Sequence, residues 1–112
     1  MGGVSGALGR VPGDDGLDGA VARLAVGARQ RNLARTDRVL ELLGSVASAG
    51  TAERDEAARL CHSIAGSAGT FGDDELADGA RHLGAALSDG HADRISAALE
   101  RLRVTASTLR SR

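Results

Sequence analysis

Apolar residues recur at intervals of three and four along most of the chain, and no stretch alternates between apolar and polar positions as a half-buried strand would. This spacing predicts helices over about 51–70, 73–87 and 92–109. Gly72 and the pair Asp89-Gly90 mark the turns between them. Because these connections are short, we expect consecutive helices to pack antiparallel.

The segment before Gly50 carries an apolar stripe from Leu17 to Val46, and it predicts either one bent helix or two. Thr36 could be the N-cap of a second helix. We expect Gly50 to be the glycine that follows the helix end and Thr51 to cap the next helix. The glycine-rich residues 1–13 predict a flexible tail, with the helical domain over 14–112. The expected fold class is all-α, an antiparallel four-helix bundle with an N-terminal helical extension.

Composition narrows the class of protein. The 112 residues include one Phe and no Tyr or Trp, so the core must come from Leu, Val, Ile and Ala. All basic side chains are Arg, the net charge is −1 and no basic stripe appears, which argues against nucleic acid as a partner. No apolar run approaches the ~20 residues that span a membrane. The single cysteine, Cys61, cannot form an internal disulfide, which fits a reducing compartment. We therefore expect a soluble, cytoplasmic protein, and because each helix shows about one apolar stripe we expect a monomer.

The most informative residue is His62. On a helical wheel of about 100° per residue, the apolar stripe is centred near Ala57 and His62 lies roughly 140° away, on the solvent side. Its neighbours on that side are unusually small, namely Ala58, Gly66 and Gly69. Each helical glycine destabilises by ~1 kcal/mol relative to Ala. Such residues leave the imidazole prominent and let another protein's backbone approach, although close helix–helix packing is the alternative explanation for the glycines.

A prominent imidazole on a rigid helix is suited to carrying a phosphoryl group. It supplies an uncharged, nucleophilic nitrogen near neutral pH. The nitrogen, the phosphorus and a partner's aspartate oxygen must then approach in line.

The residues around His62 also match a known pattern. The run His62-Ser-Ile-Ala-Gly66-Ser-Ala-Gly69-Thr-Phe-Gly72, followed by Leu-Ala and then Ala-Arg-His-Leu, resembles the signature of histidine-containing phosphotransfer (Hpt) domains. The resemblance is strongest over 55–87. It implies a helical bundle in which His62 accepts a phosphoryl group from an aspartate of a response-regulator receiver domain and passes it to another receiver.

The resemblance also implies the partners and the cofactor requirement. A hybrid sensor histidine kinase is a further candidate partner beside the receivers. The receiver domain supplies Mg²⁺, and the chain needs no cofactor or metal of its own. Without Lys the chain cannot contain a G-x-x-x-x-G-K-[ST] nucleotide loop, so we expect a stoichiometric phosphocarrier rather than an enzyme.

One position departs from the family pattern. Many members carry Lys three residues after the histidine, where this chain has Ala65. In the sequence, Arg59 is the nearest candidate for the missing positive charge, although it could instead pair with Asp55 or Glu56. The site predicted from sequence therefore contains His62 as phosphoacceptor and a set of supporting or docking residues: Arg59, Ala58, Ala65, Gly66 and Gly69.

Two other functions remain open at this point. The chain could be a helical docking module that binds or sequesters a receiver or kinase without transferring phosphate. It could also be a dimerising bundle without a signalling role, which predicts an apolar stripe left unburied in the monomer. His82 and His91 are expected at the surface, and their spacing relative to Cys61 matches no zinc pattern.

Overall fold

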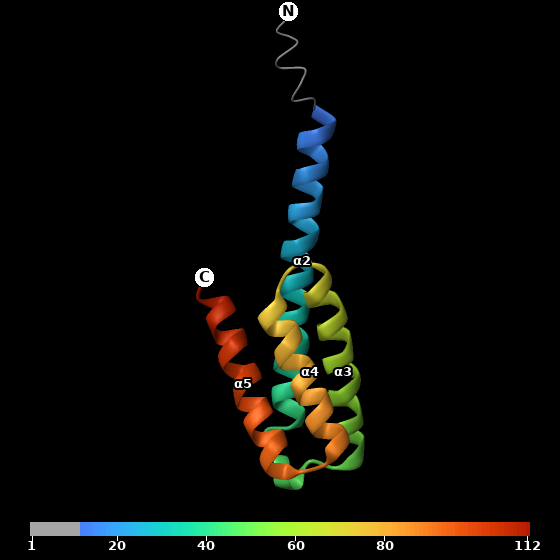
Figure 1. Cartoon of the computed structure of the whole chain (residues 1–112), viewed down its shortest axis with the longest axis vertical. Helices are drawn as coiled ribbons and strands as arrows, with labels where there is room; N and C mark the ends of the chain where they lie inside the picture. The colour runs from blue at the N-terminus through green and yellow to red at the C-terminus, as the bar shows by residue number, and fades with distance from the viewer. Residues whose placement is uncertain (1–11) are drawn as a thin grey trace, which may run out of the picture.

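The computed structural model describes residues 12–112, which form four α-helices and one short 3₁₀-helix. The helices run alternately down and up (Figure 1). The beginning of α2 at Pro12 and the C-terminus therefore lie towards the same end of the molecule. This confirms the all-α bundle, and the described part contains no strand. The elements are α2 (Pro12–Leu42), η1 (Val46–Ser48), α3 (Thr51–Thr70), α4 (Asp74–Asp89) and α5 (Ala92–Arg110).

The first bundle helix and the N-terminal extension are one continuous helix, α2. Thr36 is therefore not an N-cap: it is buried inside the helix, and its Oγ1 donates to the carbonyl oxygen of Asn32 at 2.8 Å. Proline suits a first helical turn because its missing N–H has no partner there. Helix α2 accordingly starts at Pro12, so this residue and Gly13 do not belong to the predicted tail. The rest of that tail, 1–11, lies outside the described residues.

The connection from α2 to α3 differs from the prediction. Gly50 has φ −81°, so it is not in the left-handed conformation expected of a glycine after a helix end, and it takes the N-cap position predicted for Thr51. Helix α2 has already ended at Leu42, and η1 fills the intervening segment. The Arg54 guanidinium donates to the carbonyl oxygens of Val46 (3.1 Å) and Ala49 (3.2 Å), which satisfies backbone acceptors in this irregular stretch.

The other two turns lie where the sequence predicts them. Gly72 (φ 87°) and Gly90 (φ 78°) are both in the left-handed region, which only glycine enters without steric cost. The Gly90 N–H donates to the carbonyl oxygen of Ala86 at 2.9 Å and closes α4. These two turns set the antiparallel order of α3, α4 and α5.

The core consists of small and aliphatic side chains, which allows the helices to approach closely. A Cβ added at Gly79 would lie 3.3 Å from Leu102 Cδ1 on α5, and one at Gly84 would lie 3.9 Å from Cys61 Cβ on α3. Packing of this density makes deletion of core atoms costly. The largest fully buried apolar side chains are Leu43, Ile64, Leu76, Leu83, Ile95, Leu102 and Val39.

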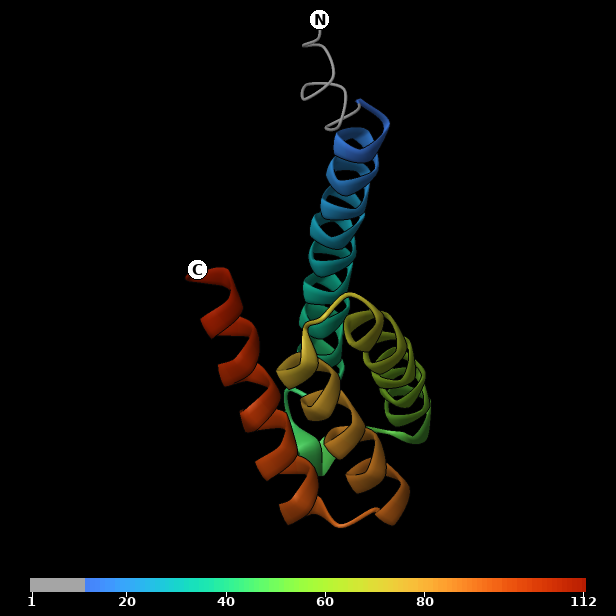
Figure 2. The ribbon, with the colours of Figure 1, turned by 45° about the horizontal axis from the view of Figure 1, so that its top comes forward.

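Ion pairs hold α2 against the rest of the bundle. Arg29 binds Asp73 through two hydrogen bonds, Nε to Oδ2 at 3.1 Å and NH2 to Oδ1 at 2.5 Å, and only 7% of the Asp73 side chain is exposed. Arg110 of α5 likewise binds Asp37, at 2.7 Å. On the N-terminal side of Arg29, α2 projects alone beyond the other helices (Figures 1 and 2). We call residues 12–27 the arm. Among the described residues, no helix has the length and hydropathy needed to cross a membrane.

Candidate functional site

His62 lies on α3 at an open hollow between α3 and α4, and its side chain is exposed as predicted. The hollow has a volume of about 320 Å³. Within the described chain, no hydrogen bond ties the imidazole to another residue, so its ring nitrogens are accessible. The lining residues are Ala58, Cys61, His62 and Ala65 from α3, and Ala80, Arg81, Gly84 and Ser88 from α4.

Small residues form most of this lining. Apart from His62 and Arg81, the side chains around the hollow are alanine, glycine, serine and the buried Cys61. No long side chain shields the imidazole on the α4 side except that of Arg81. The arrangement can therefore present one nucleophile and one cation to a group that enters the hollow.

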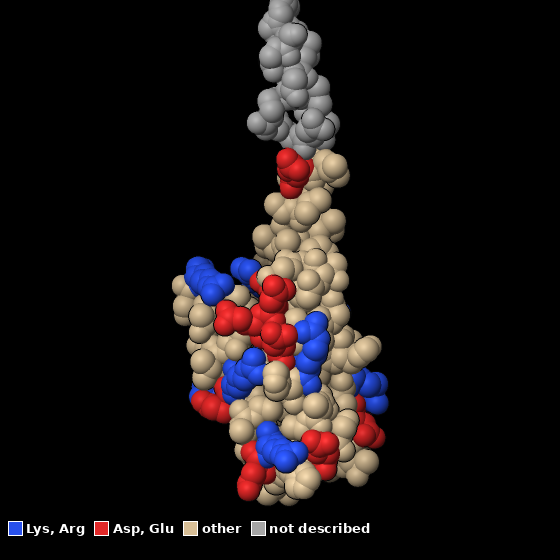
Figure 3. Space-filling view, in the orientation of Figure 1, with Lys and Arg blue, Asp and Glu red and all other residues tan. Residues whose placement is uncertain are grey.

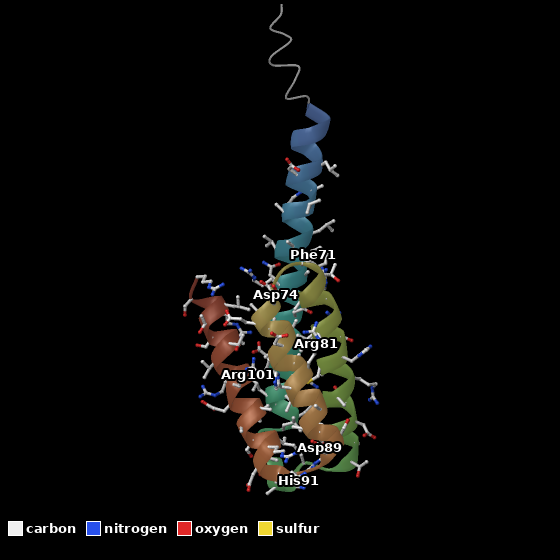
Figure 4. The ribbon with its side chains drawn as sticks, in the orientation of Figure 1. Phe71, Asp74, Arg81, Asp89, His91 and Arg101 are labelled. Atoms are coloured by element: carbon white, nitrogen blue, oxygen red, sulfur yellow. The ribbon has the colours of Figure 1, made fainter. Side chains whose placement is uncertain are left out.

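Arg81 reaches from α4 across towards α3. A Cβ added at Gly69 would lie 3.3 Å from Arg81 NH2, so the missing side chain at Gly69 leaves room for the guanidinium over the surface of α3. Arg81 NH1 also donates to Asp78 Oδ1 at 2.7 Å. Figure 4 labels Arg81 on α4, on the side of that helix next to α3. More than half of its side chain is exposed, so it remains available to a ligand.

The remaining predicted site residues differ in exposure and in whether they line the hollow. Gly66 is exposed and a Cβ there would meet no atom within 4 Å, in agreement with an open approach to His62. Ala58 is half-buried and lines the hollow. Ala65 is only 9% exposed and belongs to the core cluster, so it presents little surface to a docking partner. Gly69 faces α4, so close helix–helix packing explains this glycine better than docking of a partner does.

Arg59 does not line the hollow. It is exposed on α3, and Glu56, one of its two expected partners, instead accepts hydrogen bonds from Arg38 of α2 at 2.9 and 3.3 Å. The Arg38 guanidinium lowers the pKa of the Glu56 carboxyl. Arg81, and not Arg59, is therefore the basic residue that lines the hollow.

The sequence did contain a signal for Arg81. Helices α3 and α4 form an antiparallel hairpin about Gly72, and His62 precedes that glycine by ten residues while Arg81 follows it by nine. Residues at nearly equal distances from the turn lie at the same level of an antiparallel helix pair. The helical wheel of α3 alone does not use this relation.

The other histidines lie away from the hollow. Nδ1 of His82 lies 2.8 Å from Arg101 NH1, on the side of α4 that faces α5, and His91 is exposed in the turn before α5. Figure 4 shows Arg101 on α5 and His91 at the lower end of the bundle. No group of three or more potential metal-ligating side chains occurs within residues 12–112.

The Cys61 thiol is expected to be inert in the folded chain. Burial raises its pKa to about 12, which lowers the thiolate fraction near neutral pH by roughly 10³. Alkylation by iodoacetamide at pH 8 should be at least roughly 100-fold slower in native than in denatured protein. Because the folded pKa is raised, this group destabilises the fold only as pH rises above its unfolded value near 9. Equal labelling rates with and without denaturant would show that Cys61 is accessible.

Comparisons with protein-family models, with curated proteins and with solved structures gave no match to this chain. Three structural features bear on the function of this chain: the exposed His62, the small residues around it and Arg81, which lines the same hollow.

Proposed function

We propose that this chain is a histidine phosphotransfer domain, which carries a phosphoryl group on His62 between receiver domains of a two-component phosphorelay. The observation that carries the proposal is the exposed imidazole at a hollow of small residues, with Arg81 of α4 among the residues that line the same hollow. The signature around His62 supports the same reading. Phosphorelays operate in the cytoplasm, so the proposal includes that location.

The transfer reaction needs little from this chain beyond the nucleophile. The unprotonated ring nitrogen of His62 provides the electron pair for a new P–N bond, and the P–O bond to the receiver aspartate breaks with its electrons remaining on the carboxylate. The imidazolium then releases its ring proton to water. The reverse sequence passes the phosphoryl group to a second receiver. The receiver contributes the acidic pocket and the Mg²⁺, so the chain is a carrier rather than an enzyme.

Arg81 supplies the positive charge that Ala65 does not. The phosphoryl oxygens on His62 would enter the hollow that Arg81 lines, and a guanidinium can bind two such oxygens at once. Asp78 holds the guanidinium through a single hydrogen bond, which leaves other N–H groups free to donate.

The exposed Gly66 is expected to be needed for docking rather than for folding. Gly66→Ala should raise the free energy of unfolding by about 0.5–1 kcal/mol, because alanine is the better helix former and the added Cβ meets open space. Gly66→Leu should slow transfer from a receiver by about tenfold or more, because it obstructs backbone approach to His62. Urea denaturation and single-turnover transfer measure the two effects.

A matched control is available in the arm. Gly16 is also a helical glycine with no atom within 4 Å of an added Cβ. It lies in the arm of α2, whereas His62 lies on α3 within the bundle. Gly16→Leu should therefore leave the transfer rate unchanged. If Gly66→Leu transfers as fast as the wild type, the surface around Gly66 is not part of the docking site.

The direct test of the proposal uses receiver domains from the source organism, labelled with ³²P on their aspartate. Mixing each with the chain and Mg²⁺ should move label onto the chain, in a form that is acid-labile and alkali-stable as a phosphoramidate is. Receivers that bind but give no label would favour the docking module. The absence of both binding and label across all receivers would contradict the proposal.

A further inference from the structure

A second open depression, which we call the groove, lies between α4 and α5, whereas the hollow at His62 lies between α3 and α4. The groove has a volume of about 370 Å³, which is within the range of small-molecule sites. Each helix lines it with residues at spacings of three, four and seven, which share one helix face. Its floor consists of four alanines: Ala85, Ala86, Ala97 and Ala98.

The floor is open because its side chains are single methyl groups. Ala86 is buried and Ala98 is half-buried, while Ala85 and Ala97 are exposed. The long side chains that line the groove stand about one helical turn away from the alanines, towards its two ends. An aliphatic group laid over the floor would remove apolar surface from water on both sides of the contact, which favours binding.

Charge is balanced at only one end of the groove. At that end Arg94 of α5 pairs with Asp89 of α4, NH1 to Oδ2 at 3.2 Å. At the other end Arg101 forms no ion pair with any side chain that the structure describes, and its NH1 lies 2.8 Å from Nδ1 of His82. Figure 3, in the orientation of Figure 4, shows uncharged surface between the level of Arg101 and the charged side chains around Asp89. One guanidinium charge therefore lines the groove without a counter-ion.

His82 makes two contacts that exclude each other as hydrogen bonds. Its Nδ1 lies 2.8 Å from Arg101 NH1, which is a donor, and 2.8 Å from the backbone oxygen of Asp78, which is an acceptor. One ring nitrogen either accepts or donates, so it satisfies only one of these groups. The Asp78 carboxylate accepts from Arg81 and is not a partner of Arg101. An anion in the groove would bind Arg101 and leave Nδ1 free to donate to Asp78.

We propose that the groove binds a small carboxylate with an apolar tail. A guanidinium can donate to both oxygens of a carboxylate, and the single unpaired charge at Arg101 matches a monoanion. The tail would lie over the four alanines towards Asp89. Residues 82 and 89 are separated by roughly 10 Å along the axis of α4, which suits a tail of about four to eight carbons.

This site is separate from the proposed phosphotransfer. No residue that lines the groove also lines the hollow at His62. Binding of a carboxylate can therefore be measured on the unphosphorylated chain, without a receiver domain or Mg²⁺. Failure of the groove to bind would leave the proposed function as it stands, and failure of phosphotransfer would leave the groove as it stands.

Titration of hexanoate into the ¹⁵N-labelled full chain at constant ionic strength tests the proposal. Saturable NMR shifts are expected at the backbone amides of Ala85, Ala97 and Ala98, with a Kd of about 20 mM or below. Hexanamide has the same tail without the charge, and acetate has the charge without the tail. Each should bind at least about tenfold more weakly than hexanoate, because each lacks one of the two interactions.

Arg101→Gln should weaken hexanoate binding by about tenfold or more, because it removes the cation that meets the carboxylate. Arg103→Gln is the matched control, because it removes the same charge from α5 at a residue that pairs with Glu100 and does not line the groove. This variant should bind hexanoate as the wild type does. Ala97→Asp places a negative charge on the floor and should abolish binding with the bundle intact, because Ala97 is exposed.

Four results would overturn the site. The first is a wild-type chain that shows no saturable shift with hexanoate, and the second is a set of shifts confined to the hollow at His62. The third is hexanamide or acetate that binds as tightly as hexanoate. The fourth is an Arg103→Gln variant that loses as much affinity as Arg101→Gln, which would show a general effect of charge rather than a contact in the groove.

Discussion

His62→Gln is expected to abolish acceptance of phosphate from a receiver, with a rate at least ~10³-fold below that of the wild type. Glutamine keeps a polar, hydrogen-bonding side chain of similar length but has no nucleophilic ring nitrogen. The fold should be unaffected, because His62 is exposed and makes no hydrogen bond to another described residue. Substitutions at such surface positions usually change stability by less than about 0.5 kcal/mol. Single-turnover transfer of ³²P measures the loss.

The chain provides its own controls for this experiment. His82→Gln and His91→Gln make the same chemical change at the two other histidines, which lie outside the hollow. Both variants should transfer as the wild type does. Label on His62→Gln at a wild-type rate, or its loss in either control, would show that the wrong histidine has been assigned.

Arg81→Gln is expected to slow transfer by about 10–100-fold while leaving the fold intact. A preorganised cation that meets developing charge contributes about this much or more in other sites. The stability change should be small, because the pair lost with Asp78 is exposed and joins residues three apart on one helix. The lifetime of the phosphorylated chain without receivers should also change, since Arg81 would contact the phosphoryl oxygens. Both the transfer rate and this lifetime can be followed by ³²P.

Arg59→Gln is the matched control for Arg81→Gln. It removes the same charge from the neighbouring helix, but at a position that does not line the hollow. It should reduce transfer by no more than about twofold, through general electrostatic effects. Arg81→Lys should restore part of the rate, because it restores the charge without the planar pair of donors. If Arg59→Gln is the slower variant, the positive charge acts from α3 and the role assigned to Arg81 is wrong.

Much of the fold could be predicted because local signals determine it. The turns at Gly72 and Gly90 need a left-handed residue, and each glycine stands where the apolar periodicity is interrupted. Helix α5 was predicted over about 92–109 and spans Ala92–Arg110. In these places residue preference and tertiary structure agree.

The continuity of α2 could not be predicted, because tertiary contacts determine it. Thr36 is a good N-cap residue in sequence, but here it is buried and its hydroxyl donates to Asn32, four residues earlier in the same helix. The Asn32 amide donates in turn to Ser67 Oγ of α3 at 3.1 Å. Cross-helix partners of this kind have no local sequence signal, so the helix continues through residues that would end it elsewhere.

The candidate site was predicted only as far as one helix allows. The wheel of α3 placed His62 and Gly66 correctly on the solvent side. It placed Gly69 away from the core, whereas Gly69 faces α4, because the position of α4 determines which flank of α3 is covered. It also could not pair His62 with Arg81, which requires the geometry of the hairpin.

The most direct measurement maps the phosphoryl group within the chain. Trypsin cuts after Arg59, Arg81 and Arg94, so peptide 60–81 contains His62 as its only histidine and peptide 82–94 contains the other two. After reaction with a labelled receiver, digestion and mass spectrometry at alkaline pH should find the phosphoryl group on peptide 60–81, attached to His62. Phosphate on peptide 82–94, or a receiver that binds the chain and transfers nothing to it, would contradict the account.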